Sequence, residues 1–521
     1  MKLNRLDFIE AGWANDHRLD LIMNRASLIM QEKGISDVKY VMKLLRREFP
    51  DAYASLSMRG AGDAPVVLSE AIVADTESEH KNLQKVRSQM QELMRCPVVV
   101  RGSLMPDACP VGGGAASMPV GGVVVAENAI IPAAHSSDIC CSMFVSFYRQ
   151  GQDIDSELNV LEQATRFGPG VRSEPVFHEV LDEPVWSNPF LRGLEAKALG
   201  HMADQGDGNH FAYLGCMEVT QTLLSRLNEA GYAEMATALL EDVGSSLNVL
   251  VTHHGSRGLG SVVYGRGLEA AVKMTARYAR GIPEEAAWIY ADSSQGQDYW
   301  QALQYLSRWT RANHASIHQR FLDGLGQASL WQLGNQHNFV WQRGREYVHG
   351  KGATPAWKDD SGRPRLGLIP LNMAEPVLLV LGGDQQEFNS FAPHGAGRNL
   401  SRRGILKQYK RRGQLDLKAM DDEMKRTTQG IKVRWYQGQA DITETPVGYK
   451  PAAKVMEQIE TFALASVLAK IEPRGCMMAG RKPAPGEKPL SPKQIRQRQH
   501  RAERRRNNQR NWMDDHQEDQ W

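Results

Sequence analysis

The chain has 521 residues, a mass of 58.1 kDa and a formal net charge of +2. Apolar residues make up 42% of it, which is enough for a sizeable core and excludes wholesale disorder. No apolar run approaches the ~18 residues that cross a bilayer, the first residues lack a secretory signal, and six cysteines are too few for a disulfide scaffold. These features predict a cytoplasmic protein of enzyme size without a membrane partner.

The charge is distributed unevenly along the chain. Residues 481–512 contain eleven Lys and Arg and two acids, whereas residues 1–480 carry a net charge of −3. The segment opens with RKPAPGEKPLSP, so residues 481–521 are predicted to be a Pro-rich linker and a basic, disordered tail. The alternative is an arm that contacts nucleic acid and becomes helical there.

The rest of the chain alternates helical and strand patterns, which predicts an α/β or α+β fold. Residues 1–95 are mostly polar, helical in pattern and without a chemical motif. From there on, strands are predicted at 97–100, 121–126, 246–252 and 376–381, and helices at 217–243, 296–323 and 453–470. Gly-dense loops follow several of these strands, and we expect function to lie on them. Residues 96–480 are therefore predicted to form one catalytic domain.

Histidines in Gly-flanked loops carry the first chemical signal. Asp138 and Cys141 lie three residues apart, so a tight turn could aim a carboxylate and a thiolate at one ion, although a buried structural cysteine is the simpler interpretation. His210, His253 and His337 lie in similar loops, and each alone is most simply a hydrogen-bonded bystander. Together these residues suit a binuclear site with a bridging thiolate, which spacing alone does not establish.

Two further histidine segments have different interpretations. His394 lies in HGAGR, where Gly allows close approach to a phosphate and Arg398 can bind its charge. This His could be a nucleophile towards phosphorus or the positioning group of an ordinary anion-binding loop. His314 and His318 lie four residues apart in a predicted helix, but Ala315 replaces the Glu of the metalloprotease pattern, so we expect a structural or surface role.

Seven separated segments together resemble the RtcB family of RNA-splicing ligases. They are PDA, SSDICC, GNHF, HHGSRGLG, HNF, HGKGAT and HGAGR, in this order, and the resemblance covers roughly residues 97–480. It implies an α/β (α+β) fold with a central metal-lined cleft, Gly-rich active-site loops at strand ends and helical insertions. It also implies a ligase that joins a 2′,3′-cyclic phosphate or 3′-phosphate RNA end to a 5′-hydroxyl end, with GTP and two Mn²⁺ ions, through a histidine–GMP intermediate.

The resemblance assigns roles to individual residues. His394 corresponds to the guanylylated histidine and Asp107 to an active-site aspartate. The implied metal ligands are Asp138, Cys141, His210, His253 and His337. The implied nucleotide-binding residues are Asn209, Asn338, Pro370, Asn372, Met373, Gly395, Ala396, Gly397, Arg398 and Tyr449. The implied partner is tRNA or rRNA with the ends named above, in splicing or RNA repair, with a helper protein and the basic tail as further candidates.

The chain departs from the family's pattern mainly around the nucleotide. Cys109 stands where the family has a histidine, and Tyr213 where it has a glutamate. Ala479 stands where the family has a lysine near its end, and this chain continues past that point. The chain therefore resembles a divergent paralogue with a divergent N-terminal region and a basic C-terminal extension. Two alternatives remain open: an RNA-end-binding or ribosome-associated factor without ligation, and a metal-dependent nucleotidyltransferase or phosphoesterase.

Overall fold

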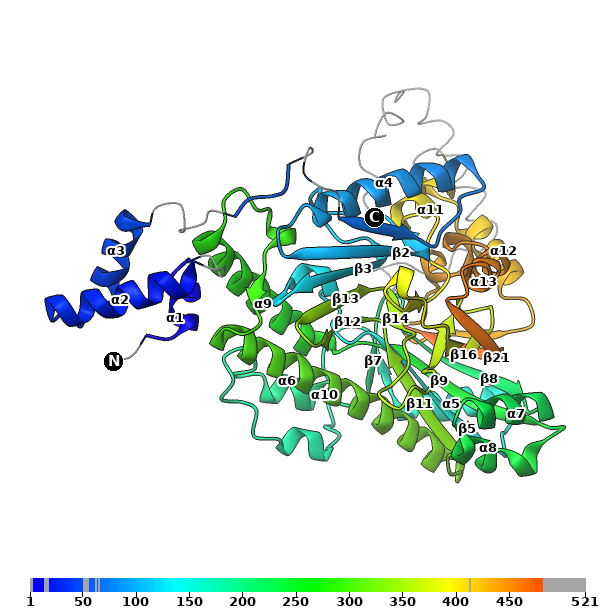
Figure 1. The fold of residues 1–521 in the computed structure, drawn as a ribbon. Coiled ribbons are helices and arrows are strands. Elements are labelled where there is room, and N and C mark those ends of the chain that lie inside the picture. Colours follow the sequence, from blue (N-terminus) through cyan, green and yellow to red (C-terminus); the bar gives the residue numbers. More distant parts are fainter. Residues whose placement is uncertain are drawn as a thin grey trace.

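The computed structural model describes residues 3–13, 18–49, 56–60, 63, 66–411 and 414–480, and the predicted tail lies outside them. The described part is a mixed α/β fold built around two sheets (Figure 1). This confirms the predicted fold class.

Five strands form the smaller sheet, in the order β1-β2-β3-β13-β12. Their bounds are β1 Val67–Glu70, β2 Val99–Cys109, β3 Val120–Glu127, β12 Asn338–Arg343 and β13 Glu346–Lys351. β1 runs parallel to β2, and the other neighbours are antiparallel. The predicted strand at 97–100 is in fact the start of the longer β2, which therefore carries Asp107 and Cys109 near its end.

The larger sheet has the order β11-β5-β9-β8-β21-β16-β15, with β20 added in parallel beside β21. Its strands are β5 Ser142–Tyr148, β8 Phe211–Glu218, β9 Ser246–His254, β11 Trp331–Gln336, β15 Leu366–Pro370, β16 Val377–Gly382, β20 Lys432–Trp435 and β21 Ala465–Met478. Short pairs complete the strands: β4 Ala129–Ile130 with β10 Ile289–Tyr290, β6 Arg166–Phe167 with β7 Asp204–Gly206, β14 Ala353–Pro355 with β17 Phe391–Pro393, and β18 Lys410–Arg411 with β19 Gln414–Leu415.

Thirteen α-helices lie in the described residues. They are α1 Arg5–Glu10, α2 Leu19–Lys33, α3 Val38–Glu48, α4 Glu77–Met94, α5 Ile154–Ala164, α6 Glu195–Gly200, α7 Gln221–Glu229, α8 Ala233–Ala238, α9 Arg257–Tyr278, α10 Ser294–Leu325, α11 Arg402–Gln408, α12 Leu417–Thr427 and α13 Ala452–Thr461. The prediction at 296–323 is confirmed by α10, whose first turn is capped by Ser293 and whose end is marked by Gly326 in the left-handed region. No helix among the described residues is both long and apolar enough to cross a bilayer.

The apolar faces of these elements pack in layers. Val86, Met90 and Leu93 of α4 pack against one face of the smaller sheet. One hydrophobic core lies between the two sheets and contains, for example, Val123 of β3 and Leu378 of β16. The larger sheet is covered by α7 and α8 on one face and by α5 and α10 on the other. Burying each such side chain stabilises the fold by about 1.5–3 kcal/mol, so these layers hold the strand ends in place.

The N-terminal region has two structural parts. α1, α2 and α3 lie at one end of the molecule (Figure 1), with their apolar side chains buried among one another. By contrast, β1 and α4 belong to the smaller sheet and its cover. Residues 67–94 are thus packed into the same layers as the strands that follow, and the domain boundary at 95/96 stays a prediction.

Two predicted helices are wrong in extent. The segment 453–470 is helical only to Thr461; after Ala463, at φ +48°, the chain forms β21. This strand is hydrogen-bonded to β16 and β8 on its two edges, and that pairing outweighs local helix propensity. The segment 217–243 starts inside β8 and is split between α7 and α8 by Gly231, at φ +84°.

Candidate metal centre and active-site pocket

The larger sheet brings thiol, imidazole and carboxylate donors to one point. Cys141 immediately precedes β5, and His253 lies near the end of the neighbouring β9, where it pairs with Met143. His210 precedes β8, whose first residue Phe211 also pairs with His253. His337 follows β11, and its amide donates to the Cys141 carbonyl at 2.9 Å. Sheet register therefore gathers residues that are far apart in the sequence.

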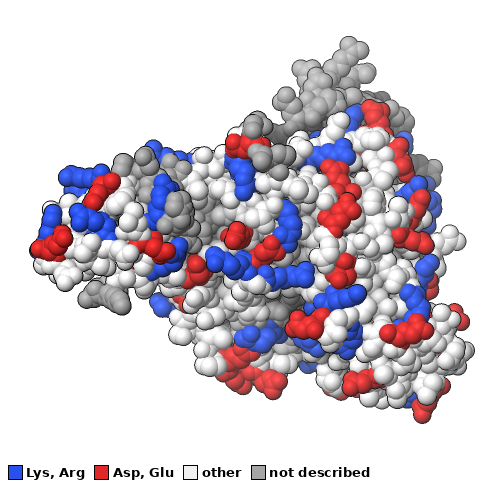
Figure 2. Space-filling model, viewed as in Figure 1, with Lys and Arg blue, Asp and Glu red and all other residues white. Residues whose placement is uncertain are grey.

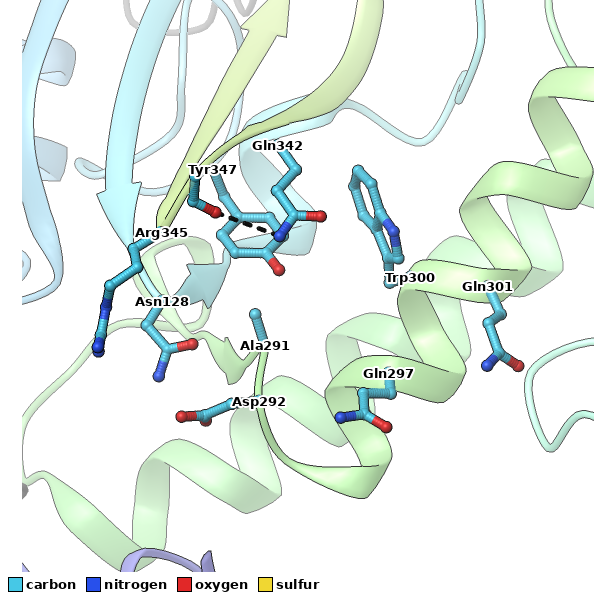
Figure 3. A pocket seen from close by; sticks show the side chains of 10 residues that line it. Asn128, Ala291, Asp292, Gln297, Trp300, Gln301, Gln342, Arg345 and Tyr347 are labelled. Carbon is cyan, nitrogen blue, oxygen red and sulfur yellow. Dashed lines mark hydrogen bonds between the residues drawn. The ribbon is translucent and has the colours of Figure 1, made fainter.

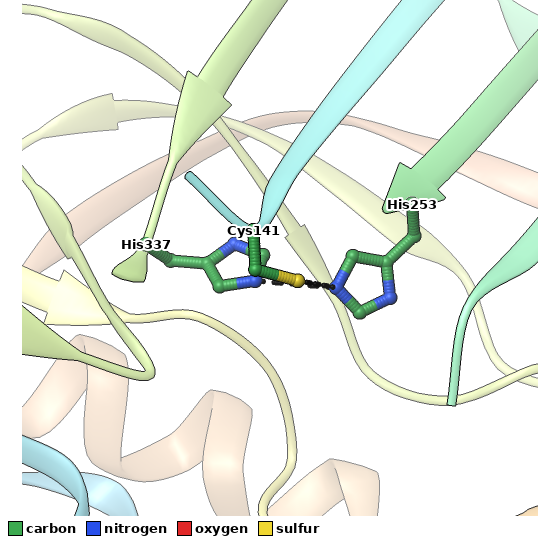
Figure 4. A group of neighbouring side chains, drawn as sticks. All are labelled: Cys141, His253 and His337. Carbon is green, nitrogen blue, oxygen red and sulfur yellow. Dashed lines mark hydrogen bonds between the residues drawn. The ribbon is translucent and has the colours of Figure 1, made fainter. Parts of the chain in front are cut away.

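The donor atoms form two groups that share one sulfur. Cys141, His253 and His337 make one group, and Asp138, Cys141 and His210 the other, with donors in each within 4.8 Å of one another. Figure 4 shows the first group, in which the Cys141 Sγ and His253 Nε2 atoms are 3.2 Å apart. In the second, the Asp138 Oδ2 and His210 Nε2 atoms are 2.9 Å apart. All five predicted ligands are thus neighbours.

The electrostatics of this cluster suit a cation. Burial lowers the pKa of His253 to about 3 and holds the pKa of His337 well below its usual value, so both imidazoles are neutral and can donate a lone pair. Burial and the nearby Asp138 carboxylate raise the pKa of the Cys141 thiol. A positive ion would offset that cost by stabilising the thiolate. The donor set is compatible with metal binding, and Cys141 belongs to both donor groups.

Asp107 fixes the orientation of His394. The His394 Nδ1 atom lies 2.5 Å from the Asp107 Oδ2 atom, and the His394 backbone amide donates to the same oxygen at 3.2 Å. The carboxylate selects the tautomer with the proton on Nδ1, which leaves the Nε2 lone pair available. The ring centroids of His394 and His337 are 4.9 Å apart, so the His394 imidazole lies beside the donor cluster.

The loop that holds His394 needs glycine at one position. Gly397 has φ +71°, and a Cβ atom there would come within 2.0 Å of the Asp107 carbonyl oxygen. Only glycine permits both the left-handed backbone and this close approach. The HGAGR segment therefore packs directly against the end of β2.

A cavity of about 410 Å³ opens beside His394 and His253. Of the predicted nucleotide-binding residues, it is lined by Asn209, Pro370, Asn372, Met373, Gly395, Ala396, Gly397, Arg398 and Tyr449. Asn338 does not line it. Its side-chain amide instead donates to the Asp138 carbonyl at 3.3 Å and accepts from the Gly352 amide at 2.7 Å. Asn338 thus connects the loop that carries Asp138 to the loop after β13.

Several residues around the pocket were missed by sequence analysis. Arg402, Arg403 and Glu444 line it, and Arg402 donates to Glu444 at 2.6 Å. Lys450 is buried and donates to the carbonyls of Pro106 and Ala108, at 2.8 Å each, so it holds the strand end that carries Asp107. Their only sequence signals were the arginine pair after HGAGRNLS and the GYK segment.

Arg398 is held by the protein rather than left free in the pocket. Its guanidinium donates to the Thr443 carbonyl at 2.7 Å and to the Leu400 carbonyl at 3.2 Å. The same group lies 5.0 Å from the centre of the Tyr449 ring. These contacts restrict its orientation and place a fixed positive charge at the pocket wall.

A layer of buried polar side chains lies next to the donor cluster. Thr252 Oγ1 contacts His314 Nδ1 at 2.7 Å and His318 Nε2 at 2.8 Å. Ser142 Oγ contacts the other nitrogen of His314 at 3.0 Å, and Ser146 Oγ that of His318 at 2.7 Å. Both histidines are buried, which confirms the structural alternative for this pair. The layer joins α10 to β5 and β9, the strands beside which Cys141 and His253 lie.

We expect Thr252→Val to lower the free energy of unfolding by about 2–4 kcal/mol, since an isosteric methyl group leaves two buried imidazole nitrogens without a partner. Urea denaturation followed by circular dichroism would measure the change. Thr237→Val is the matched control, because this exposed hydroxyl bonds only to the Ala233 carbonyl. A loss no larger than that of the control would contradict the structural role of the layer.

Comparison with known proteins identifies related sequences. The family model described as tRNA-splicing ligase RtcB matches residues 187–479, more than half of the chain. The tRNA-splicing ligases RtcB of Thermococcus kodakarensis and Archaeoglobus fulgidus are both 26% identical, over 44% and 52% of this chain and 51% and 58% of their own. The RNA-splicing ligase RtcB of Escherichia coli is 23% identical over 71% of this chain and 88% of its own. The chain thus spans about half the length of the first two relatives.

Proposed function

This chain belongs to the RtcB family, and on that premise we propose that it is an RNA ligase. The proposed reaction joins a 2′,3′-cyclic phosphate or 3′-phosphate end to a 5′-hydroxyl end, with GTP and two Mn²⁺ ions, in tRNA splicing or RNA repair in the cytoplasm. The observation that carries the proposal is the position of His394. Its Nε2 atom is available as a nucleophile, and the residue lies between the five-residue donor cluster and a cavity.

In the proposed first step, His394 Nε2 attacks the α-phosphorus of GTP. A P–N bond forms, the bond to pyrophosphate breaks, and the histidine carries GMP. Asp107 stabilises the positive charge that develops on the imidazole, because its carboxylate accepts a hydrogen bond from the Nδ1–H group. Arg402 and Arg403 line the cavity and provide charge complementary to the phosphates.

In the proposed second step the P–N bond breaks as the guanylate passes to an oxygen of the RNA 3′-phosphate, which frees the imidazole; a 2′,3′-cyclic phosphate end is first opened by water to a 3′-phosphate. In the third step the 5′-hydroxyl loses its proton to solvent and attacks that phosphate, and GMP leaves. Guanylylation activates the RNA 3′-phosphate, because GMP is a good leaving group whereas a phosphate oxygen is a poor one. The ions, held by Asp138, Cys141, His210, His253 and His337, would supply charge stabilisation to the entering and departing oxygens. Cys141, His210, His253 and His337 are buried, whereas Asp138 is partly exposed at the mouth of the cluster.

We expect the full chain to seal a nicked RNA stem-loop with 3′-phosphate and 5′-hydroxyl ends in Mn²⁺ and GTP, and His394→Ala to abolish sealing. His80→Ala, on the exposed side of α4, is the control for loss of a histidine elsewhere. Product is measured by denaturing electrophoresis. If a folded, metal-loaded sample gives no product with GTP or ATP, the ligase proposal is wrong. RNA binding without sealing, unchanged by His394→Ala, would instead support the end-binding alternative.

A further inference from the structure

A second cavity, of about 500 Å³, lies at the turn of the β12–β13 hairpin (Figure 3). Its lining includes Asn128, Asp292, Gln297, Trp300, Arg345 and Tyr347. It shares no lining residue with the cavity beside His394. β12 connects the two regions, because it starts next to His337 and ends at Arg343. At ~3.3 Å per residue this separation is about 17 Å.

Two aromatic side chains make one wall of this cavity. Trp300 comes from α10 and Tyr347 from β13, and their rings meet edge to face with centroids 5.6 Å apart. Figure 3 shows both rings on the same side of the open space. Trp300 is only partly buried and therefore has a face available to a ligand. Aromatic faces of this kind stack on flat, unpaired nucleobases.

The opposite wall carries an unsatisfied acceptor. The Asp292 Oδ1 atom is buried and has no hydrogen-bond partner among the described residues. In Figure 3 the Asp292 carboxylate and the Gln297 amide lie across the space from the rings. The Asp292 Oδ1 atom has almost no exposed surface, so a ligand reaches it only after this side chain turns toward the cavity. That turn is favourable when the ligand brings N–H groups, because a buried carboxylate oxygen without a donor is unfavourable.

Backbone hydrogen bonds hold the two sides of the cavity together. The Asn128 amide donates to the Arg345 carbonyl at 2.8 Å, and the Ala291 amide donates to the Asn128 carbonyl at 3.0 Å. Asn128 itself has φ +49°, a conformation that asparagine tolerates better than most residues. The hairpin turn and the segment that carries Asp292 are thus fixed to a common residue, which favours a preformed pocket.

We propose that this cavity binds an unpaired guanine base of the RNA substrate, an inference that rests on the proposed function. Guanine presents the N1–H and N2–H₂ donors side by side, and a carboxylate can accept from both. Adenine and cytosine each present an acceptor beside a single amino group, and uracil has one N–H between two carbonyls. Trp300 stacks on the base, and Arg345, at the exposed rim, binds the adjoining phosphate.

Fluorescence anisotropy of labelled oligouridylate tests the proposal, with one internal guanosine or adenosine placed at successive positions. We expect the protein to bind the best guanosine oligonucleotide about tenfold more tightly than its adenosine counterpart. Asp292→Asn should remove this preference. Trp300→Ala should weaken binding of the guanosine oligonucleotide to the level of its adenosine counterpart. Asp298→Asn, the same change six residues along the chain outside this cavity, should retain the preference.

The outcomes separate this proposal from the ligase proposal. Metal content and circular dichroism confirm folding of each variant without reference to ligation. Active sealing with no guanosine preference, or a preference that Asp292→Asn retains, would overturn the guanine site alone. No sealing with an Asp292-dependent preference would overturn the ligase proposal alone. Free GMP that binds as tightly as the oligonucleotide, in an Asp292-dependent way, would assign the cavity to a free nucleotide and overturn its assignment to RNA.

Discussion

Cys141→Ala is expected to reduce bound metal from two ions per chain to none, because the sulfur of Cys141 belongs to both donor groups. His337→Ala removes a donor from only one group and should leave one ion bound. Metal content after dialysis, measured by mass spectrometry, gives these stoichiometries. With Co²⁺ in place of Mn²⁺, loss of the thiolate-to-metal absorption band in Cys141→Ala provides a second readout that does not depend on activity.

The matched control for this experiment is Cys140→Ala. Cys140 is the adjacent residue and is also buried, but it belongs to neither donor group. Its variant should bind as much metal as the unmodified protein. Retention of two ions by a folded Cys141→Ala protein would rule out the shared thiolate.

Asp107→Asn is expected to slow transfer of GMP to the protein by between about 100-fold and 10,000-fold. The asparagine amide can donate to His394 Nδ1, which favours the tautomer with its proton on Nε2 and removes the lone pair needed for attack. Single-turnover labelling with GTP carrying a labelled α-phosphate measures the rate. Because Asp107 acts through His394, the affinity for GTP and the metal content should stay close to their original values.

Asp360→Asn, at an exposed carboxylate, controls for loss of charge. A labelling rate for Asp107→Asn within twofold of this control would show that the carboxylate does not orient the nucleophile. Equal losses in rate and in GTP affinity would instead indicate that the pocket has collapsed.

The donor cluster could largely be predicted from the sequence, because each donor lies at or next to a strand end within a short, unusual segment. His210 and His337 lie next to the ends of β8 and β11, and His253 lies near the end of β9. All three have Gly or Asn nearby in the sequence, and antiparallel register brings these strand ends together. The sequence suggested a thiolate shared by two sites, but spacing alone did not establish it, since the position of Cys141 in two donor groups depends on distances across three strands. That these groups hold ions stays a prediction.

The pocket and the long-range pairing were harder to predict. Glu444 and Lys450 act through contacts with residues about 40 and 340 positions away, and no local pattern encodes such contacts. The exchange of a predicted helix for β21 has the same origin. Residues 465–470 look helical alone, but their hydrogen bonds to β16 are available only once that strand has assembled beside them.

The hydroxyl-and-imidazole layer behind the cluster has a fixed direction. The Gln332 side-chain amide, which can only donate here, contacts Ser146 Oγ at 2.8 Å. At the other end, the Ser142 hydroxyl donates a hydrogen bond to the Cys140 carbonyl, which can only accept, at 2.8 Å. Each hydroxyl between these ends must then donate in one direction and accept from the other.

This ordering determines the tautomers of both histidines in the layer. His314 and His318 each carry their single proton on Nε2 and accept at Nδ1, because only that arrangement gives every contact one hydrogen. An added proton at either Nδ1 would face a hydroxyl that is already donating. Burial lowers the pKa of His318 to about 3, in agreement with this. The layer is therefore not suited to relay protons, because its ends are an amide donor and a carbonyl acceptor, and neither group takes up or releases a proton near neutral pH.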